Sequence, residues 1–234
     1  LSKGISKEEL TRRLKKLSQA LPLISNEQSV PNELKPFCPE LLDNTICRNS
    51  SKEVKLLAAC CLADVLRIYA PNAPYDDREK KVFIFILRTL LQRIFEQYFL
   101  PELEGLGQMA SPFYDRYFYL LENLANVCSP LILVELGAED TIIAMFDLFF
   151  NLVKEVHCLP ILLQELKSKV EFYMLDILAS LVTELDTISP ALLDTVLVRL
   201  AQKVSNENPG AHSLALKLIG RCEAQFETPI SQFI

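Results

Sequence analysis

Apolar residues recur every three or four positions through most of this chain, which is the spacing of an amphipathic α-helix. The first such run has a leucine stripe on one face: Leu10, Leu14, Leu17 and Leu21. Ser6 precedes the stripe as an N-cap, and Glu9 follows three residues later, as in a capping box. The pattern predicts a lead helix from Ser6 to about Ala20, which Pro22 ends.

The most apolar element is predicted from Ser51 to Tyr69. Ser51 can cap its amino end, and Glu53 lies in its first turn, where a carboxylate interacts favourably with the helix dipole. Apolar side chains cover a wide face of this helix: Val54, Leu57, Ala58, Cys61, Leu62, Val65, Leu66 and Tyr69. A face this wide exceeds what one neighbour buries, so we expect the helix to be packed on two sides.

Residues 70–75, Ala-Pro-Asn-Ala-Pro-Tyr, follow this helix directly. Each proline disfavours the α region for the residue before it, so the segment must be extended or turned. We therefore expect a rigid elbow, after which Asp76 or Asp77 caps another helix that ends near Leu100. An ordinary turn between helices is the alternative interpretation of the elbow.

Five further long or capped helices are predicted downstream, and Ser189-Pro190 and Asn208-Pro209 each supply a cap residue followed by proline at the first helical position. Their expected ranges are 113–127, 140–156, 167–186, 189–204 and 208–225, with shorter helices at 40–47 and after Ser129. No segment reads as a credible strand. The prediction is an all-α protein.

The helix starts near Lys167 and Asn208 are separated by about the 40 to 47 residues of HEAT or armadillo units. We therefore expect a HEAT/armadillo-type α-solenoid of antiparallel helix pairs, with a compact helical bundle as the alternative. The predicted organisation is a single array over residues 1–234: a lead helix at 1–22, a linker at 23–39, and repeats at 40–234. Residues 93–109 are expected to form an insertion loop at the surface, because Pro101, Gly105 and Gly107 break regular structure.

Composition and charge narrow the range of functions. Half of the 234 residues are hydrophobic, so the chain can bury a core, and the formal net charge of -6 opposes direct binding to a phosphate backbone. The segment nearest to a membrane span, Lys81 to Leu100, is interrupted by Arg88, Arg93 and Glu96. We expect a soluble protein with no secretory signal, and a fragment of a longer chain, since it begins at Leu1 rather than Met.

The seven cysteines are expected to be reduced thiols in a cytoplasmic or nuclear protein, because each lies in an apolar run. Cys60 and Cys61 are adjacent on a helix and diverge by about 100°, so they suit core packing better than a metal or redox pair. His157 with Cys158, and His212 with Cys222, also lack metal-ligand spacing. We predict no metal and no cofactor.

The sequence also contains few candidate catalytic residues. The chain has no glycine-rich phosphate loop, only two histidines, and no recognisable nucleophile with its base. Asp115, Arg116, Glu122 and Asn123 have near-helical spacings that fit either intrahelical pairs or a polar interaction surface. We expect the protein not to be an enzyme.

Three strings carry a resemblance to a known family: Ile5 to Leu17 (ISKEELTRRLKKL), Lys52 to Tyr75 (KEVKLLAACCLADVLRIYAPNAPY) and Asp115 to Val127 (DRYFYLLENLANV). They resemble the N-terminal repeats of the sister-chromatid cohesion regulators called precocious dissociation of sisters (Pds), and Ser189 to Leu200 is a weaker match further on. The chain departs from the family pattern at Asn72, where an acidic residue is usual, and in the insertion from Arg93 to Met109.

The resemblance implies a cohesin-associated scaffold in the nucleus, associated with chromosomes through cohesin, that binds the kleisin subunit. It further implies that the elbow is a docking patch for short Tyr-Ser-Arg type peptides of the release factor Wapl and of competing proteins. The implied partner-binding residues are those of the elbow with three nearby carboxylates that could receive a peptide arginine: Ala70, Pro71, Asn72, Ala73, Pro74, Tyr75, Asp64, Asp76 and Asp77.

Two other functions stay open at this point. One is an unrelated HEAT or armadillo adaptor, for example in nuclear transport, which would need an inner ridge lined by Asn and Trp, and this chain has no Trp. The other is a helical enzyme, which would have to show turnover that is lost when a buried Cys or His is replaced.

Overall fold

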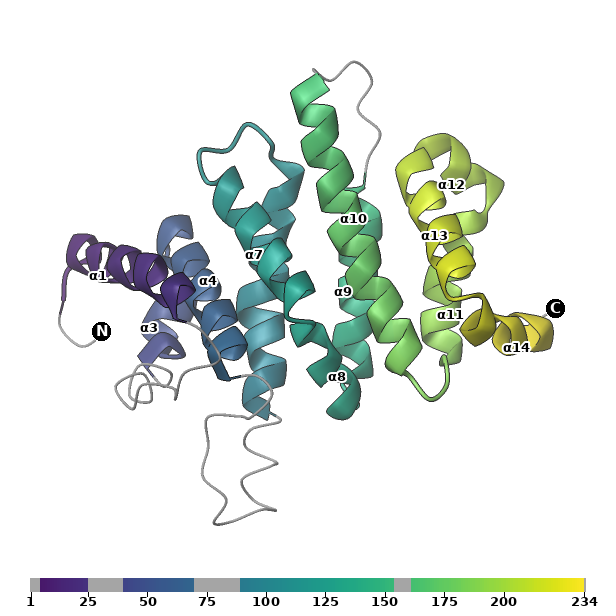
Figure 1. Ribbon diagram of the computed structural model, residues 1–234, viewed down its shortest axis with the longest axis horizontal. Helices are drawn as coiled ribbons and strands as arrows, with labels where there is room; N and C mark the ends of the chain where they lie inside the picture. The colour runs from purple at the N-terminus through teal and green to yellow at the C-terminus, as the bar shows by residue number, and fades with distance from the viewer. Residues whose placement is uncertain (1–4, 25–39, 70–88, 154–160, 234) are drawn as a thin grey trace, which may run out of the picture. The chain divides into compact units, whose positions relative to one another are not determined.

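The computed structural model describes residues 5–24, 40–69, 89–153 and 161–233 (Figure 1). The chain divides into two compact units, Leu1–Ser129 and Pro130–Ile234. Throughout the described ranges the regular structure is helical, with no strand. This confirms the all-α prediction.

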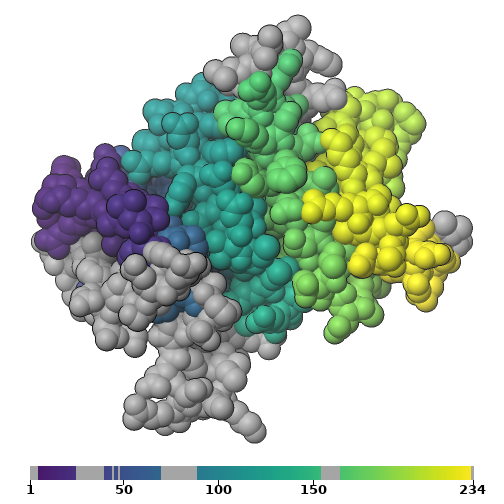
Figure 2. Space-filling view, viewed as in Figure 1, coloured from purple at the N-terminus to yellow at the C-terminus, as the bar shows by residue number. Residues whose placement is uncertain are grey.

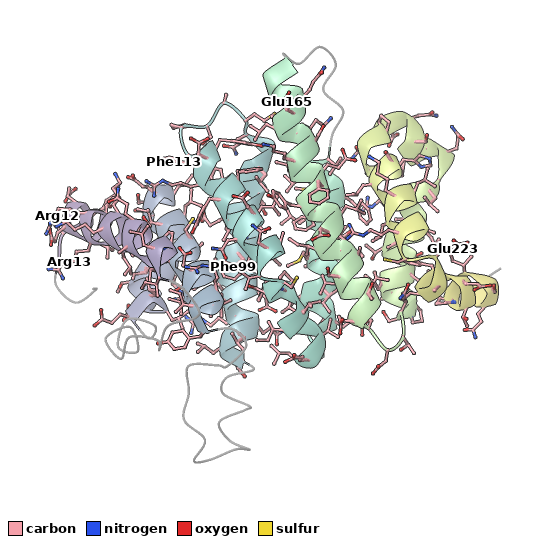
Figure 3. The ribbon with its side chains drawn as sticks, in the orientation of Figure 1. Arg12, Arg13, Phe99, Phe113, Glu165 and Glu223 are labelled. Carbon is pink, nitrogen blue, oxygen red and sulfur yellow. The ribbon has the colours of Figure 1, made fainter. Side chains whose placement is uncertain are left out.

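The first unit begins with α1, Lys7–Ala20, at the position that the leucine stripe predicts. The Ser6 hydroxyl accepts a hydrogen bond from the backbone N–H of Glu9 at 3.3 Å, so the predicted cap is confirmed. Arg12 and Arg13 project from α1 (Figure 3), and both donate to the carboxylate of Glu9, which lowers the pKa of Glu9 to about 2. A single 3-10 turn, η1 (Leu21–Leu23), continues the helix past Pro22.

Helix α4, Lys52–Tyr69, is the centre of this unit, and the short α3, Asn44–Cys47, precedes it. Every residue from Leu56 to Val65 is buried. α1 packs on one part of its surface and α7 on another, which confirms that this helix is covered on two sides. Uniform burial of a helix is typical of a position between other helices.

The predicted surface insertion at 93–109 is wrong. Helical turns fill most of it: the end of a helix described from residue 89, the π-helical turn η3 (Phe95–Phe99), α6 (Leu100–Leu103) and the 3-10 helix η4 (Glu104–Gly107). The segment contributes side chains to the core that are at most 5% exposed: Phe95, Tyr98, Phe99, Leu103 and Leu106. Residues 93–107 are therefore part of the folded unit.

Pro101 misled the prediction because proline usually breaks a helix interior. Here it occupies the first turn of α6, where its missing N–H would have no intrahelical partner. The wider turn before it closes with a bond from the N–H of Leu100 to the carbonyl of Phe95, five residues back. The π turn thus joins two helical segments across the proline. Helix α7, Tyr114–Asn126, then follows close to its predicted range.

The described part of the second unit is also helical. In chain order its elements are η5 (Ser129–Leu131, which starts at the unit boundary), α8 (Ile132–Glu135), α9 (Glu139–Leu152), α10 (Ile161–Glu184), α11 (Pro190–Leu197), η6 (Val198–Leu200), α12 (Gln202–Glu207), α13 (Pro209–Arg221) and α14 (Glu223–Phe233). Ser189 and Asn208 cap α11 and α13 as predicted.

Four boundaries in this unit differ from the prediction. α9 ends at Leu152 rather than near Val156. α10 begins at Ile161 rather than near Lys167. The helix expected to run to Val204 breaks at Ala201, whose backbone is extended, and α12 begins after it. The helix expected to run to Gln225 ends at Arg221, and α14 restarts after Cys222.

Apolar and ionic contacts together hold the second unit. The rings of Phe146, Phe149 and Phe150 on α9 are fully buried. α10 and α13 lie side by side (Figure 2), and two ion pairs cross between them: Glu171 with Lys217 at 2.5 Å, and Asp176 with Arg221 at 2.6 Å. Arg199 pairs with Asp147 at 2.7 Å and lies over the ring of Phe150.

Within the described ranges, no single helix is long and apolar enough to cross a bilayer; the pair Tyr114–Asn126 and Ser129–Glu135 meets that test only jointly, across a bend. The four cysteines whose side chains are described, Cys60, Cys61, Cys128 and Cys222, are free thiols. The prediction of free thiols is confirmed for these four.

Candidate functional site

Among the described residues of the first unit, one carboxylate is fully buried, that of Asp64 in α4. It lies within an otherwise apolar stretch of the helix, between Ala63 and Val65. A carboxylate in such surroundings needs charge-assisted hydrogen bonds to offset the loss of water. The residues that provide them, Arg67, Tyr119 and Asn123, form with Asp64 what we call the Asp64 cluster.

Helix α7 supplies two of the hydrogen-bond donors. The Tyr119 hydroxyl donates to Oδ1 of Asp64 at 2.7 Å, and Nδ2 of Asn123 donates to the same oxygen at 3.1 Å. Tyr119 and Asn123 are four residues apart, so one face of α7 presents both groups to α4. These bonds connect the two helices through polar groups inside an apolar interface.

Arg67, one turn after Asp64 on α4, provides the positive charge. Its Nε lies 3.5 Å from Oδ1 of Asp64, which is an ion pair longer than an ideal hydrogen bond. Its two terminal nitrogens donate to the backbone carbonyls of Leu21, at 2.9 Å, and Ile24, at 3.0 Å. The guanidinium thus joins Asp64 to the end of η1.

Burial dominates the electrostatics of Asp64. Loss of water raises the pKa of its carboxyl, and the bond from Tyr119 and the charge of Arg67 oppose that rise only in part. The same burial, reinforced by the negative charge of Asp64, raises the pKa of the Tyr119 hydroxyl. Oδ2 of Asp64 and Oδ1 of Asn123 are buried acceptors without a hydrogen bond in the structure.

The cluster has no features of a catalytic or metal centre. Among the described residues, no three His, Cys, Asp or Glu side chains gather as metal ligands would. Burial raises the pKa of the neighbouring Cys60 to about 12, so this thiol is not an activated nucleophile at neutral pH. What these residues can do is orient three segments of backbone relative to one another.

Of the nine residues predicted to bind a partner, only Asp64 lies in the described part of the chain; residues 70–77 lie outside it. Asp64 differs from the surface carboxylate that the prediction needs, since none of its surface is exposed. Its Oδ1 already accepts from Tyr119 and Asn123. In this structure Asp64 orders the helices instead of facing a peptide.

The sequence prediction missed Arg67 and Tyr119, and it placed Asn123 among groups that form either intrahelical pairs or a polar interaction surface. One signal was present, because Asp64 and Arg67 are three residues apart, as are the partners of an intrahelical ion pair. Nothing in the sequence pattern indicated the hydrogen bonds from Arg67 to the carbonyls of Leu21 and Ile24. They depend on tertiary packing of segments more than 40 residues apart.

Through the described ranges, successive helices pack against one another, which is typical of an all-helical repeat protein of the HEAT type. Comparison with known proteins gives the family. The model of the family described as sister chromatid cohesion protein PDS5 matches residues 8–234. The chain belongs to this family.

The individual relatives agree. The chain is 36% identical over 237 aligned residues to sister chromatid cohesion protein PDS5 homolog B of Homo sapiens, and equally to that of Gallus gallus; each alignment covers 100% of this chain and 15% of the relative. It is 35% identical to homolog A of Danio rerio, over 98% of this chain and 16% of the relative. The chain therefore spans about a sixth or less of the length of these relatives.

A solved structure, that of the Pds5-Scc1 complex, has the same fold. The TM-score is 0.76 at 22% identity, over 97% of this chain and 33% of the solved one. This similarity confirms the predicted helical-repeat fold.

Proposed function

We propose that this chain is part of a non-catalytic scaffold that regulates cohesin. The observation that carries the proposal is the family match, which extends over residues 8–234 and so includes almost the whole chain. The same match argues against the alternative of an unrelated HEAT or armadillo adaptor. In the described ranges the Asp64 cluster positions backbone and no group of metal ligands gathers, which supports binding rather than catalysis.

The first proposed partner is the kleisin subunit of cohesin. The support is the relative solved as a Pds5-Scc1 complex, in which Scc1 is the kleisin. Because this chain spans 15% of the first relatives' length, we assign kleisin binding to the complete protein. Binding to kleisin would associate the protein with chromosomes in the nucleus, without direct contact to DNA.

The second proposed partner is a short peptide of a Wapl-type release factor or of a protein that competes with it. The proposed docking patch is the elbow, Ala70 to Tyr75, with Asp76 and Asp77 as the carboxylates that receive a peptide arginine. Prolines limit the conformations of the free segment, so less entropy is lost on binding. Asp64 enters this proposal as a buried residue of the helix that leads to the elbow, not as the arginine acceptor.

An affinity experiment with the complete protein tests the cohesin assignment. Immobilised kleisin is expected to retain the complete protein, and an equal amount of an unrelated helical-repeat protein is the control. Absence of retention above that control would contradict the first partner. Turnover of any substrate that disappears when a buried cysteine or His212 is replaced would contradict the non-catalytic assignment.

A further inference from the structure

The lead helix α1 is attached to its unit mainly through α4. Among the described elements, its main packing neighbours are α4 and its own continuation η1. Leu10 and Leu14 are its buried leucines, while Arg12 and Arg13 on the outer side are 57% and 45% exposed. One further ion pair joins Lys15 of α1 to Glu53 of α4 at 2.7 Å. With Leu21 of η1, which is also buried, these leucines place the described apolar support of α1 on α4.

Arg67 fixes the carboxyl end of this segment. Carbonyls at the end of a helix can accept bonds from outside as well as from the last turn. Within η1, the carbonyl of Leu21 already accepts the N–H of Ile24 at 3.1 Å. Arg67 of α4 donates to the carbonyls of Leu21 and Ile24, two points that are three residues apart. The planar guanidinium can satisfy both at once, which lysine cannot do with the same geometry.

Arg67 is itself oriented by Asp64, and Asp64 is held from α7. The ion pair to Oδ1 of Asp64 is long, at 3.5 Å, whereas the bond from Tyr119 to the same oxygen is short, at 2.7 Å. Asn123 adds a third bond at 3.1 Å. In Figure 1, α4 lies between α1 and α7, so the chain of contacts crosses the helix that separates them.

We propose that this chain of contacts, Tyr119 to Asp64 to Arg67 to the carbonyls of Leu21 and Ile24, is a relay by which α7 controls the docking of α1. α1 is then a detachable cap on α4, and any event that disturbs Tyr119 or Asn123 on α7 loosens it. The relay is a property of the fold that is independent of the peptide and kleisin proposals.

The physical basis of the relay is the free-energy cost of leaving the buried carboxylate of Asp64 without its hydrogen-bond donors. When Tyr119 no longer donates, Oδ1 of Asp64 loses its shortest bond, and the carboxylate must move toward other donors. Arg67 is the nearest cation, so a rotation of Asp64 draws the guanidinium away from Leu21 and Ile24. The end of η1 then loses its bonds to α4, and α1 opens more often by local unfolding.

Hydrogen–deuterium exchange on the whole 234-residue chain tests the relay. Tyr119→Phe removes one hydroxyl, which bonds to Asp64 and Asn123 and not to α1. It is expected to speed exchange of the backbone amides from Leu14 to Ala20 by roughly three- to tenfold. Arg67→Met should have at least as large an effect, and Arg67→Lys an intermediate one. Tyr117→Phe is the matched control, since it removes a hydroxyl from the same helix outside the Asp64 cluster.

The outcomes separate clearly. Faster exchange confined to α1 and η1 in Tyr119→Phe, and absent in Tyr117→Phe, supports the relay. Unchanged exchange of α1 in Tyr119→Phe overturns it. Equal acceleration in α1 and in α9 to α13 also overturns it, because global destabilisation then explains the result.

Discussion

Gly105 lies directly against the aromatic ring of Tyr117, so close that a Cβ on Gly105 would overlap the ring atoms. The contact brings η4 onto α7. We predict that Gly105→Ala destabilises the protein by about 1–3 kcal/mol, because the ring is only 3% exposed and cannot move aside freely. Gly220→Ala is the matched control: nothing lies within 4 Å of a Cβ there, and alanine in a helix should stabilise by about 0.5–1 kcal/mol. Urea unfolding measures both.

A substitution of Phe99 tests whether residues 95–107 belong to the core instead of forming a surface loop. Its ring is fully buried and makes an edge contact with Phe95 at 5.0 Å between centroids (Figure 3 labels Phe99). We predict that Phe99→Ala lowers the free energy of unfolding by about 3–5 kcal/mol, whereas Gln108→Ala, at an exposed position, changes it by less than about 0.5 kcal/mol. Similar small effects of both would mean that this segment is a surface loop after all.

The raised pKa of Asp64 predicts a pH dependence. The folded state binds a proton on Asp64 more readily than the unfolded state does. The protonated group therefore contributes its full stabilisation below its ordinary pKa of 3.8. That stabilisation is lost as the pH rises through the pKa of Asp64 in the folded protein. The parent is therefore expected to lose stability relative to Asp64→Asn as pH increases from about 4 toward 7. Denaturant unfolding of both proteins across this pH range measures the difference in their free energies of unfolding. The other carboxylates are the same in both proteins, so their contributions cancel in this difference. A difference that grows in favour of the parent would contradict the prediction.

Asn72 stands where the family pattern has an acidic residue, and this gives a prediction for affinity. Asn72→Asp should strengthen binding of a Tyr-Ser-Arg peptide several-fold, because a charge-assisted hydrogen bond replaces a neutral one, a gain on the order of 1 kcal/mol. Calorimetric titration of the variant beside the parent measures the change. The gain should diminish at high salt if it is electrostatic.

The helices that were predicted correctly are those whose caps and apolar faces depend on residues close together in the sequence. Ser6, Ser189 and Asn208 each accept a bond from the backbone N–H three residues later, and a cap of this kind involves only neighbours in sequence. The leucine stripe of α1 and the apolar surface of α4 were predicted for the same reason. The features that depend on contacts between residues far apart in the sequence could not be predicted in this way.

The segment at 95–107 illustrates that limit. Pro101 and Gly105 are breakers in a local interpretation, but here the proline lies in the first turn of α6 and the glycine permits contact with Tyr117. Asp64 is a second case, because the sequence gives its helix but not the donors on α7 that make burial tolerable. The docking role of residues 70–77 stays a prediction.

Calorimetric titration of this chain with a peptide that contains Tyr-Ser-Arg tests the central claim most directly. The proposal predicts binding to one site, and loss of that binding in the double variant Pro71→Glu, Pro74→Glu while circular dichroism shows the same helix content. If the double variant binds as tightly as the parent, or the parent does not bind at all, the elbow is a turn between helices and not the docking patch.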